Sequence, residues 1–139
     1  MSTGVRRPRF RYFADPVCVG ALLVYLTNRW ILKPTGLAGW FGRDYVNDLL
    51  CLPLVVPVIL YVQSTLGIRP RDRLPTWWEV LHNAVVFAVV YEVVLPRSAA
   101  FRTVADAWDV VAYLAGGSAA YVLWRWRYGV AVGDGGDGG

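Results

Sequence analysis

Four long stretches of apolar residues, separated by polar segments, dominate the hydropathy pattern of this 139-residue chain. A helix needs about 20 mostly apolar residues to cross the hydrocarbon core of a bilayer. The stretches that meet or approach this length are Pro16–Leu32, Val46–Leu66, Trp77–Leu95 and Trp108–Trp126. The pattern therefore predicts an all-α, polytopic membrane protein with about four transmembrane helices in one bundle.

The ends of these stretches carry signals for helix starts and for membrane interfaces. Asp15 precedes Pro16, and an acidic cap followed by proline is favoured at a helix N-terminus. The pair Trp77–Trp78 opens the third stretch, and the mixed aromatic and basic segment Trp124–Tyr128 closes the fourth. Because tryptophan, tyrosine and arginine gather at headgroup level, we expect both segments to lie at membrane surfaces.

Composition narrows the class of protein. Hydrophobic residues make up 56% of the chain and charged residues only 17%, and mean hydropathy is +0.40. Soluble domains carry about 25% charged residues, so these values argue against a cytosolic globule. They also argue against a disordered chain. Two cysteines are too few for a disulfide scaffold. The net charge of +4 comes from arginines that border apolar stretches, which favours lipid over nucleic acid as the partner.

The distribution of lysine and arginine predicts the orientation. Nine of these residues lie in the N-terminal segment, the middle loop and the C-terminal end, and five lie on the opposite side. The positive-inside rule then places both termini in the cytoplasm of a multi-pass cell-membrane protein. The expected organisation is a basic cytoplasmic arm (1–15), a four-helix transmembrane domain (16–128) and a flexible Gly/Asp tail (129–139). No small-residue cleavage site follows the first stretch, so we expect it to remain uncleaved.

This orientation gathers half of the acidic residues on the outer face. They lie where the second stretch begins, where the third ends and where the fourth begins. With their polar neighbours they form the candidate ligand-binding set Asp44, Asn47, Asp48, Glu92, Arg97, Asp106, Asp109 and Tyr113.

Helical spacing refines this set. Asp44 and Asp48 are four residues apart and share a helix face, and Tyr113 continues the stripe that Asp109 begins. Glu92 lies within an apolar run, where a carboxylate costs a few kcal/mol unless it is paired or protonated. Its default partner is a local arginine, either Arg97 five residues on or one of Arg29, Arg43 and Arg102 from neighbouring segments. Glu92 is therefore either a structural ion-pair member or a functional carboxylate, and Asp106 and Asp109 either bind ligand or only cap a helix.

Small residues recur every fourth position in the last stretch, at Ala112, Gly116 and Ala120. Such spacing lets helix backbones approach closely, so the fourth helix is either central in the bundle or the contact of a homodimer. Cys18 and Cys51 fall near opposite membrane faces, on the order of 20 Å apart, and cannot form an intrachain disulfide.

No established catalytic motif is present in the sequence. It contains no glycine-rich phosphate loop, nucleophile elbow or metal-binding histidine pair. Glu79, His82 and Asn83 share the inner end of the third stretch, but a single histidine makes a metal site there improbable. We expect neither metal nor cofactor.

The order of the outer-face residues resembles the VanZ-like family of small bacterial integral membrane proteins, named for a glycopeptide (teicoplanin) resistance protein. The matching elements are Asn47–Leu54, Glu92 followed by Pro96–Arg97, and Asp109–Gly116. Where the family prefers a second asparagine, this chain carries Tyr113. The resemblance implies a helical membrane protein of the cell envelope, and it implies no particular mechanism.

Three functions fit these observations. The first is a non-enzymatic envelope protein that binds a polar or lipid-linked, cell-wall-related ligand at the outer-face residues. The second is a membrane-embedded enzyme in which Glu92 or Asp109 is the catalytic acid or base. The third is a small dimeric transporter.

The orientation predicts a labelling result. A cysteine introduced between Ser98 and Thr103 should react with a membrane-impermeant maleimide added outside intact cells, with the unmodified chain as control. Labelling only from the cytoplasmic side would reverse the topology and move the candidate site inside.

Overall fold

The computed structural model describes residues 9–95, 97 and 107–129, and every regular element in these ranges is helical. This confirms the all-α class. The helices are α1 (Pro16–Thr27), α2 (Lys33–Thr35), α3 (Gly39–Asp44), α4 (Val46–Thr65), α5 (Trp77–Val89) and α6 (Ala107–Gly129), together with a 3₁₀ turn, η1 (Tyr12–Ala14), and two π-helical segments, η2 (Asn28–Leu32) and η3 (Val90–Val94).

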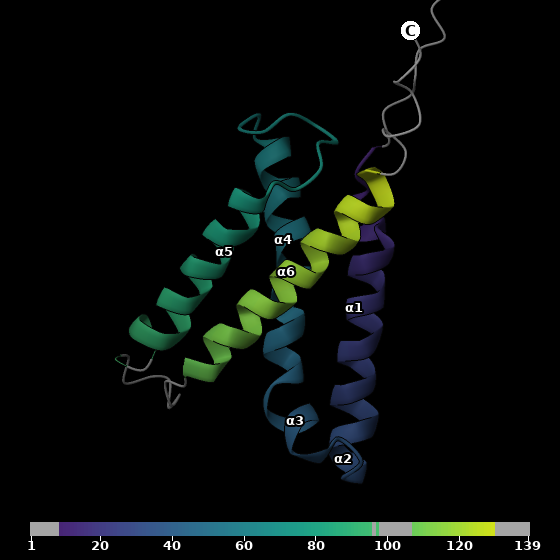
Figure 1. Cartoon of the computed structure of the whole chain (residues 1–139), viewed down its shortest axis with the longest axis vertical. Helices are drawn as coiled ribbons and strands as arrows, with labels where there is room; N and C mark the ends of the chain where they lie inside the picture. The colour runs from purple at the N-terminus through teal and green to yellow at the C-terminus, as the bar shows by residue number, and fades with distance from the viewer. Residues whose placement is uncertain (1–8, 96, 98–106, 130–139) are drawn as a thin grey trace, which may run out of the picture.

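The described residues form four helical rods, and α6 crosses in front of α4 and packs on it (Figure 1). The first rod is continuous from α1 through η2 into α2. The short helices α2 and α3 lie at one end of the molecule, where α4 begins, and we call this the α2–α3 end. The start of α1 and the end of α6 lie at the opposite end, which we call the Asp15 end.

Two helical segments are long and apolar enough to cross a membrane. They are Val46–Thr65, which is α4, and Trp77–Val94, which joins α5 to η3. By itself α1 has only 12 residues. The longer α6 includes glycine, serine, tyrosine and tryptophan among its apolar residues. By length and composition, the structure therefore contains two candidate membrane spans among its described residues.

A buried carboxylate joins the first and last helices at the Asp15 end. Asp15 caps α1, as predicted, by accepting a hydrogen bond from the Val17 amide at 2.9 Å. It also accepts bonds from the Trp124 indole at 2.9 Å and from the Tyr128 hydroxyl. Because its side chain is fully buried, these donors replace the water that the charge would otherwise bind. We call this arrangement the Asp15 clasp.

The predicted interface position of Trp124 and Tyr128 differs from what the structure shows. Trp124 and Tyr128 were expected at headgroup level, yet they are 0% and 6% exposed and belong to the core. Only the neighbouring Trp126, 71% exposed, points outward as an interface residue would. Phe10 completes the cluster, with its ring 5.6 Å from that of Trp124. Phe10, Tyr12 and Asp15 of the predicted arm are thus buried against the helix ends.

The small-residue stripe of α6 lies against α4 of the same chain. A Cβ atom added at Gly116 would overlap the carbonyl oxygen of Leu49 and lie 2.7 Å from its carbonyl carbon. Ala112 and Ala120 are buried on the same side. Of the two predicted roles, the central position of the fourth helix is the one observed. The other predicted role, a homodimer through Ala112, Gly116 and Ala120, stays a prediction.

This close contact predicts a stability effect. Replacing Gly116 with alanine should lower the free energy of unfolding by about 1–3 kcal/mol or more, because α6 must move away from the α4 backbone. Thermal unfolding of the purified protein in detergent measures the change. The matched control is Gly20→Ala on α1, where an added Cβ meets nothing within 4 Å. Equal stability of the two variants would contradict the contact.

Candidate functional site

Two polar side chains, Asp48 of α4 and Tyr113 of α6, meet where these helices pack together near the α2–α3 end. Asp48 lies in the first turn of α4 and is half-buried. The Tyr113 side chain interacts with its carboxylate. Tyr113 is only 3% exposed and lies about one turn before Gly116 on α6. The close approach of Gly116 to Leu49 therefore brings the tyrosine against Asp48, the residue before Leu49.

Two further carboxylates join this pair. Asp48 interacts electrostatically with Asp109 at the start of α6 and with Glu92 in η3. The Tyr113 side chain is also within electrostatic range of all three acids. We call Asp48, Glu92, Asp109 and Tyr113 the acid cluster. Three elements that are remote in sequence supply it, and the alternation of helix directions carries all of them to one end of the bundle.

Like charges at close range repel, and the repulsion grows as burial removes water. A cation offsets part of it, since Lys33 also interacts with Asp48. Lys33 was not among the predicted site residues. Lys33 lies near the acid cluster because the first helical rod continues through η2 into α2, past the predicted end at Leu32.

Asp44, which was predicted to share a face with Asp48, has a different environment. The helix is interrupted at Tyr45, so Asp44 is the last residue of α3. Its carboxylate lies 3.3 Å from Arg43 Nε, and both side chains are largely exposed. Arg43 is therefore engaged with Asp44, although it was considered as a partner for Glu92.

Asn47 contacts a residue that sequence reasoning missed. Asn28 is 1% exposed, and its side-chain amide donates to the Gly42 carbonyl oxygen at 2.8 Å and to Asn47 Oδ1 at 3.5 Å. Its own Oδ1 has no hydrogen-bond partner within the described ranges. Asn28 thus joins the first rod to α3 and to the start of α4. The available signal was an amide side chain within a predicted membrane span.

Arg97, one of the expected partners of Glu92, is exposed and donates from Nη1 to the Val93 carbonyl oxygen at 3.4 Å. Asp106 and Arg102 lie outside the described residues.

Two other neighbours of the acid cluster were not predicted. Cys51 interacts electrostatically with Asp48 and Tyr113. It follows Asp48 by three residues on α4, so helical periodicity could have placed it on the same face. The Tyr91 ring lies 6.3 Å from that of Tyr113 and stacks on Phe87 at 5.7 Å. Tyr91 therefore joins Phe87 of α5 to Tyr113 of α6.

Glu79 has a structural role at the opposite end. It closes a capping box with Thr76 at the start of α5 and accepts a hydrogen bond from Arg69 Nε at 2.7 Å and one from Arg73 at 3.1 Å. Arg69 is 5% exposed, so this ion pair secures the loop between α4 and α5. No group of three or more side chains in the described ranges is arranged to hold a metal ion.

The acid cluster can accept hydrogen bonds from a ligand. Carboxylates accept hydrogen bonds from hydroxyl and ammonium groups, and charge-assisted bonds of this kind are about twice as strong as neutral ones.

Comparisons of the chain with protein families, with curated proteins and with solved structures find no match. The resemblance to the VanZ-like family therefore rests on the sequence motifs alone.

The Asn28 contact predicts a stability effect at this end of the bundle. Asn28→Ala leaves the buried Gly42 carbonyl without its side-chain donor, so the free energy of unfolding should fall by about 1–3 kcal/mol. Thermal unfolding in detergent measures it. Thr27→Ala, at an exposed neighbouring position, should change stability by less than about 0.5 kcal/mol. Indistinguishable variants would show that Asn28 does not join these helices.

Proposed function

We propose that this chain is a VanZ-like, multi-pass membrane protein of the cell envelope that binds a polar or lipid-linked ligand through the acid cluster. In this proposal all four rods span the bilayer and both termini face the cytoplasm. The ligand presents amine or hydroxyl groups to Asp48, Glu92 and Asp109.

Burial supports the membrane setting. The apolar windows of Val46–Thr65 and Trp77–Val94 are only 28% and 17% buried within the protein. A core helix of a soluble protein would bury most of such a window. The first rod and α6 also display large apolar side chains on their outer surfaces, among them Leu22, Leu23, Val24, Val111, Val122 and Leu123. Exposed apolar surface of this extent is stable in lipid.

Length supports two further spans. The helical run from Pro16 to Thr35 and the 23-residue α6 are comparable with the roughly 20 residues that cross a bilayer. Glycine and small residues, which lower the hydropathy of α6, are common where membrane helices pack together. In α6 they pack against α4.

One observation carries the ligand proposal, namely that Glu92 and Asp109, on two other helical elements, act electrostatically on Asp48 and on the buried Tyr113. In a membrane protein, acidic side chains within spans are costly and typically mark a binding site or a pathway. A ligand ammonium or hydroxyl group would reduce the repulsion among the acids while gaining charge-assisted hydrogen bonds.

Lipid binding tests the proposal. We expect short-chain lipids with ethanolamine or sugar headgroups to bind the purified protein, as measured by native mass spectrometry. Glu92→Gln and Asp109→Asn should each weaken binding roughly tenfold or more, because a charge-assisted hydrogen bond is worth about 1.5–3 kcal/mol. The matched control is Asp72→Asn at the Asp15 end, where the carboxylate makes a solvent-accessible ion pair with Arg9 at 3.7 Å.

Three results would contradict the proposal. The acid cluster would have only a structural role if the control variant lost as much lipid binding as the cluster variants. The same would follow if the cluster variants lowered only the yield of folded protein. Chemical turnover of a bound lipid that Glu92→Gln abolishes would replace binding with catalysis. Solute flux through reconstituted vesicles would replace it with transport.

A further inference from the structure

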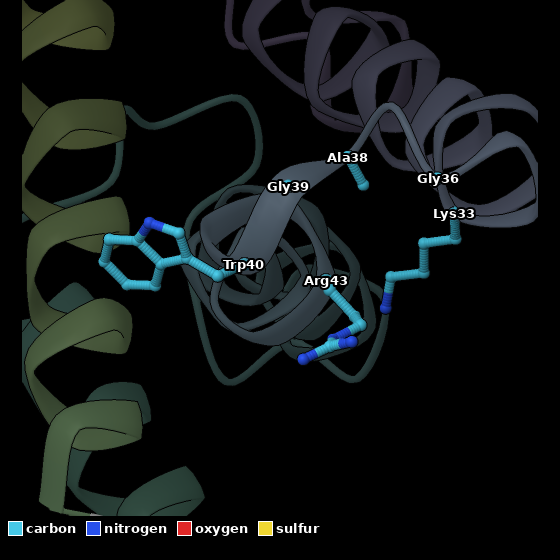
Figure 2. Close-up of a pocket in the computed structure, with 6 residues that line it drawn as sticks. All are labelled: Lys33, Gly36, Ala38, Gly39, Trp40 and Arg43. Carbon is cyan, nitrogen blue, oxygen red and sulfur yellow. The ribbon is translucent and has the colours of Figure 1, made fainter.

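A second polar feature lies at the α2–α3 end and uses different residues from the acid cluster. It is a pocket of about 430 Å³ lined by Lys33, Gly36, Ala38, Gly39, Trp40 and Arg43 (Figure 2). Its lining comes from α2, α3 and the turn between them. We call it the Lys33–Arg43 pocket.

Two glycines shape this pocket. Gly36 ends α2 with φ +74° and Gly39 begins α3 with φ +62°, backbone conformations that other residues adopt at a cost. The Gly36 amide donates to the Lys33 carbonyl oxygen at 3.3 Å, and the Ala38 amide donates to the Leu32 carbonyl oxygen at 3.1 Å. This tight turn reverses the chain direction, so that Lys33 and Arg43 lie on opposite sides of one opening.

The two cationic side chains converge there. Figure 2 shows Lys33 and Arg43 extending toward one another on one side of the turn, whereas Trp40 points away on the other. Arg43 uses Nε for Asp44, at 3.3 Å. Within the described part of the chain, neither the Lys33 ammonium nor the terminal guanidinium nitrogens of Arg43 make a hydrogen bond. Two neighbouring cations with donors facing a common opening form a site for an anion. A guanidinium fork beside an ammonium group suits the oxygens of a phosphate.

The surroundings indicate where the phosphate comes from. Large apolar side chains are exposed around the pocket, with Trp30 73%, Leu37 75% and Trp40 69% exposed. Tryptophan with nearby basic residues is typical of the headgroup level of a bilayer, where aromatic rings contact lipid and cations contact phosphate. A phosphate presented by a lipid would place its acyl chains against these residues.

We propose that the Lys33–Arg43 pocket binds the phosphate of a phospholipid headgroup. The inference stands apart from the ligand of the acid cluster, because it rests on different side chains. The single link is Lys33, whose charge also acts on Asp48. A test therefore has to separate the two sites.

Native mass spectrometry of the full chain in a nonionic detergent provides the test, with dioctanoyl phosphatidylglycerol as the probe. The double variant Lys33→Gln/Arg43→Gln should bind this lipid roughly tenfold or more weakly, because two charge-assisted contacts are lost. Arg29→Gln removes an exposed charge in η2, outside the pocket lining, and should leave binding unchanged. Thermal unfolding confirms that each variant is folded.

Two further probes identify the source of the phosphate. Dioctanoylglycerol lacks the phosphate and should not bind, and inorganic phosphate should bind more weakly than the lipid. Equal binding of inorganic phosphate would overturn the lipid source, and equal binding of dioctanoylglycerol would overturn phosphate recognition. Equal loss in Arg29→Gln would reduce the effect to general charge attraction. Loss of phosphatidylglycerol binding in Glu92→Gln with retention in the double variant would assign the lipid to the acid cluster.

Discussion

The contact between Gly116 and the backbone of Leu49 is the constraint on which the arrangement of α4 and α6 depends. With no side chain at Gly116, α6 lies directly on a carbonyl group of α4. This closeness has a chemical consequence one turn away, because it brings Tyr113 and Asp109 of α6 to Asp48 of α4. A larger residue at Gly116 would separate the helices and with them the acid cluster. The packing of α6 on α4 therefore also determines the geometry of the acid cluster.

The Asp15 clasp holds the opposite end. A fully buried carboxylate is tolerated only when hydrogen bonds replace its water, and Asp15 receives them from its own helix and from Trp124 and Tyr128 of α6. The start of α1 is thereby joined to the end of α6. Because the first rod runs uninterrupted into α2, its attachment at this end also helps to position Lys33 at the other.

The α2–α3 end thus combines two kinds of polar surface. Carboxylates from α4, η3 and α6 gather around Tyr113, while Lys33 and Arg43 converge at the neighbouring turn. Exposed aromatic and aliphatic residues surround the turn. Lys33, which acts on Asp48, lies at the junction of the two surfaces.

Local chemistry in the sequence determined the helices, the Asp15 cap and the end of the bundle where the acids gather, because periodicity, capping and the alternation of spans are local or directional properties. It misplaced Trp124 and Tyr128, since aromatic residues at a helix end look alike whether they face lipid or a buried carboxylate. The tertiary structure alone decided which side chains meet. Asn28 reaching Gly42, Lys33 acting on Asp48 and α6 packing through Gly116 all depend on the rotation and closeness of helices, which arise from packing between segments distant in the chain.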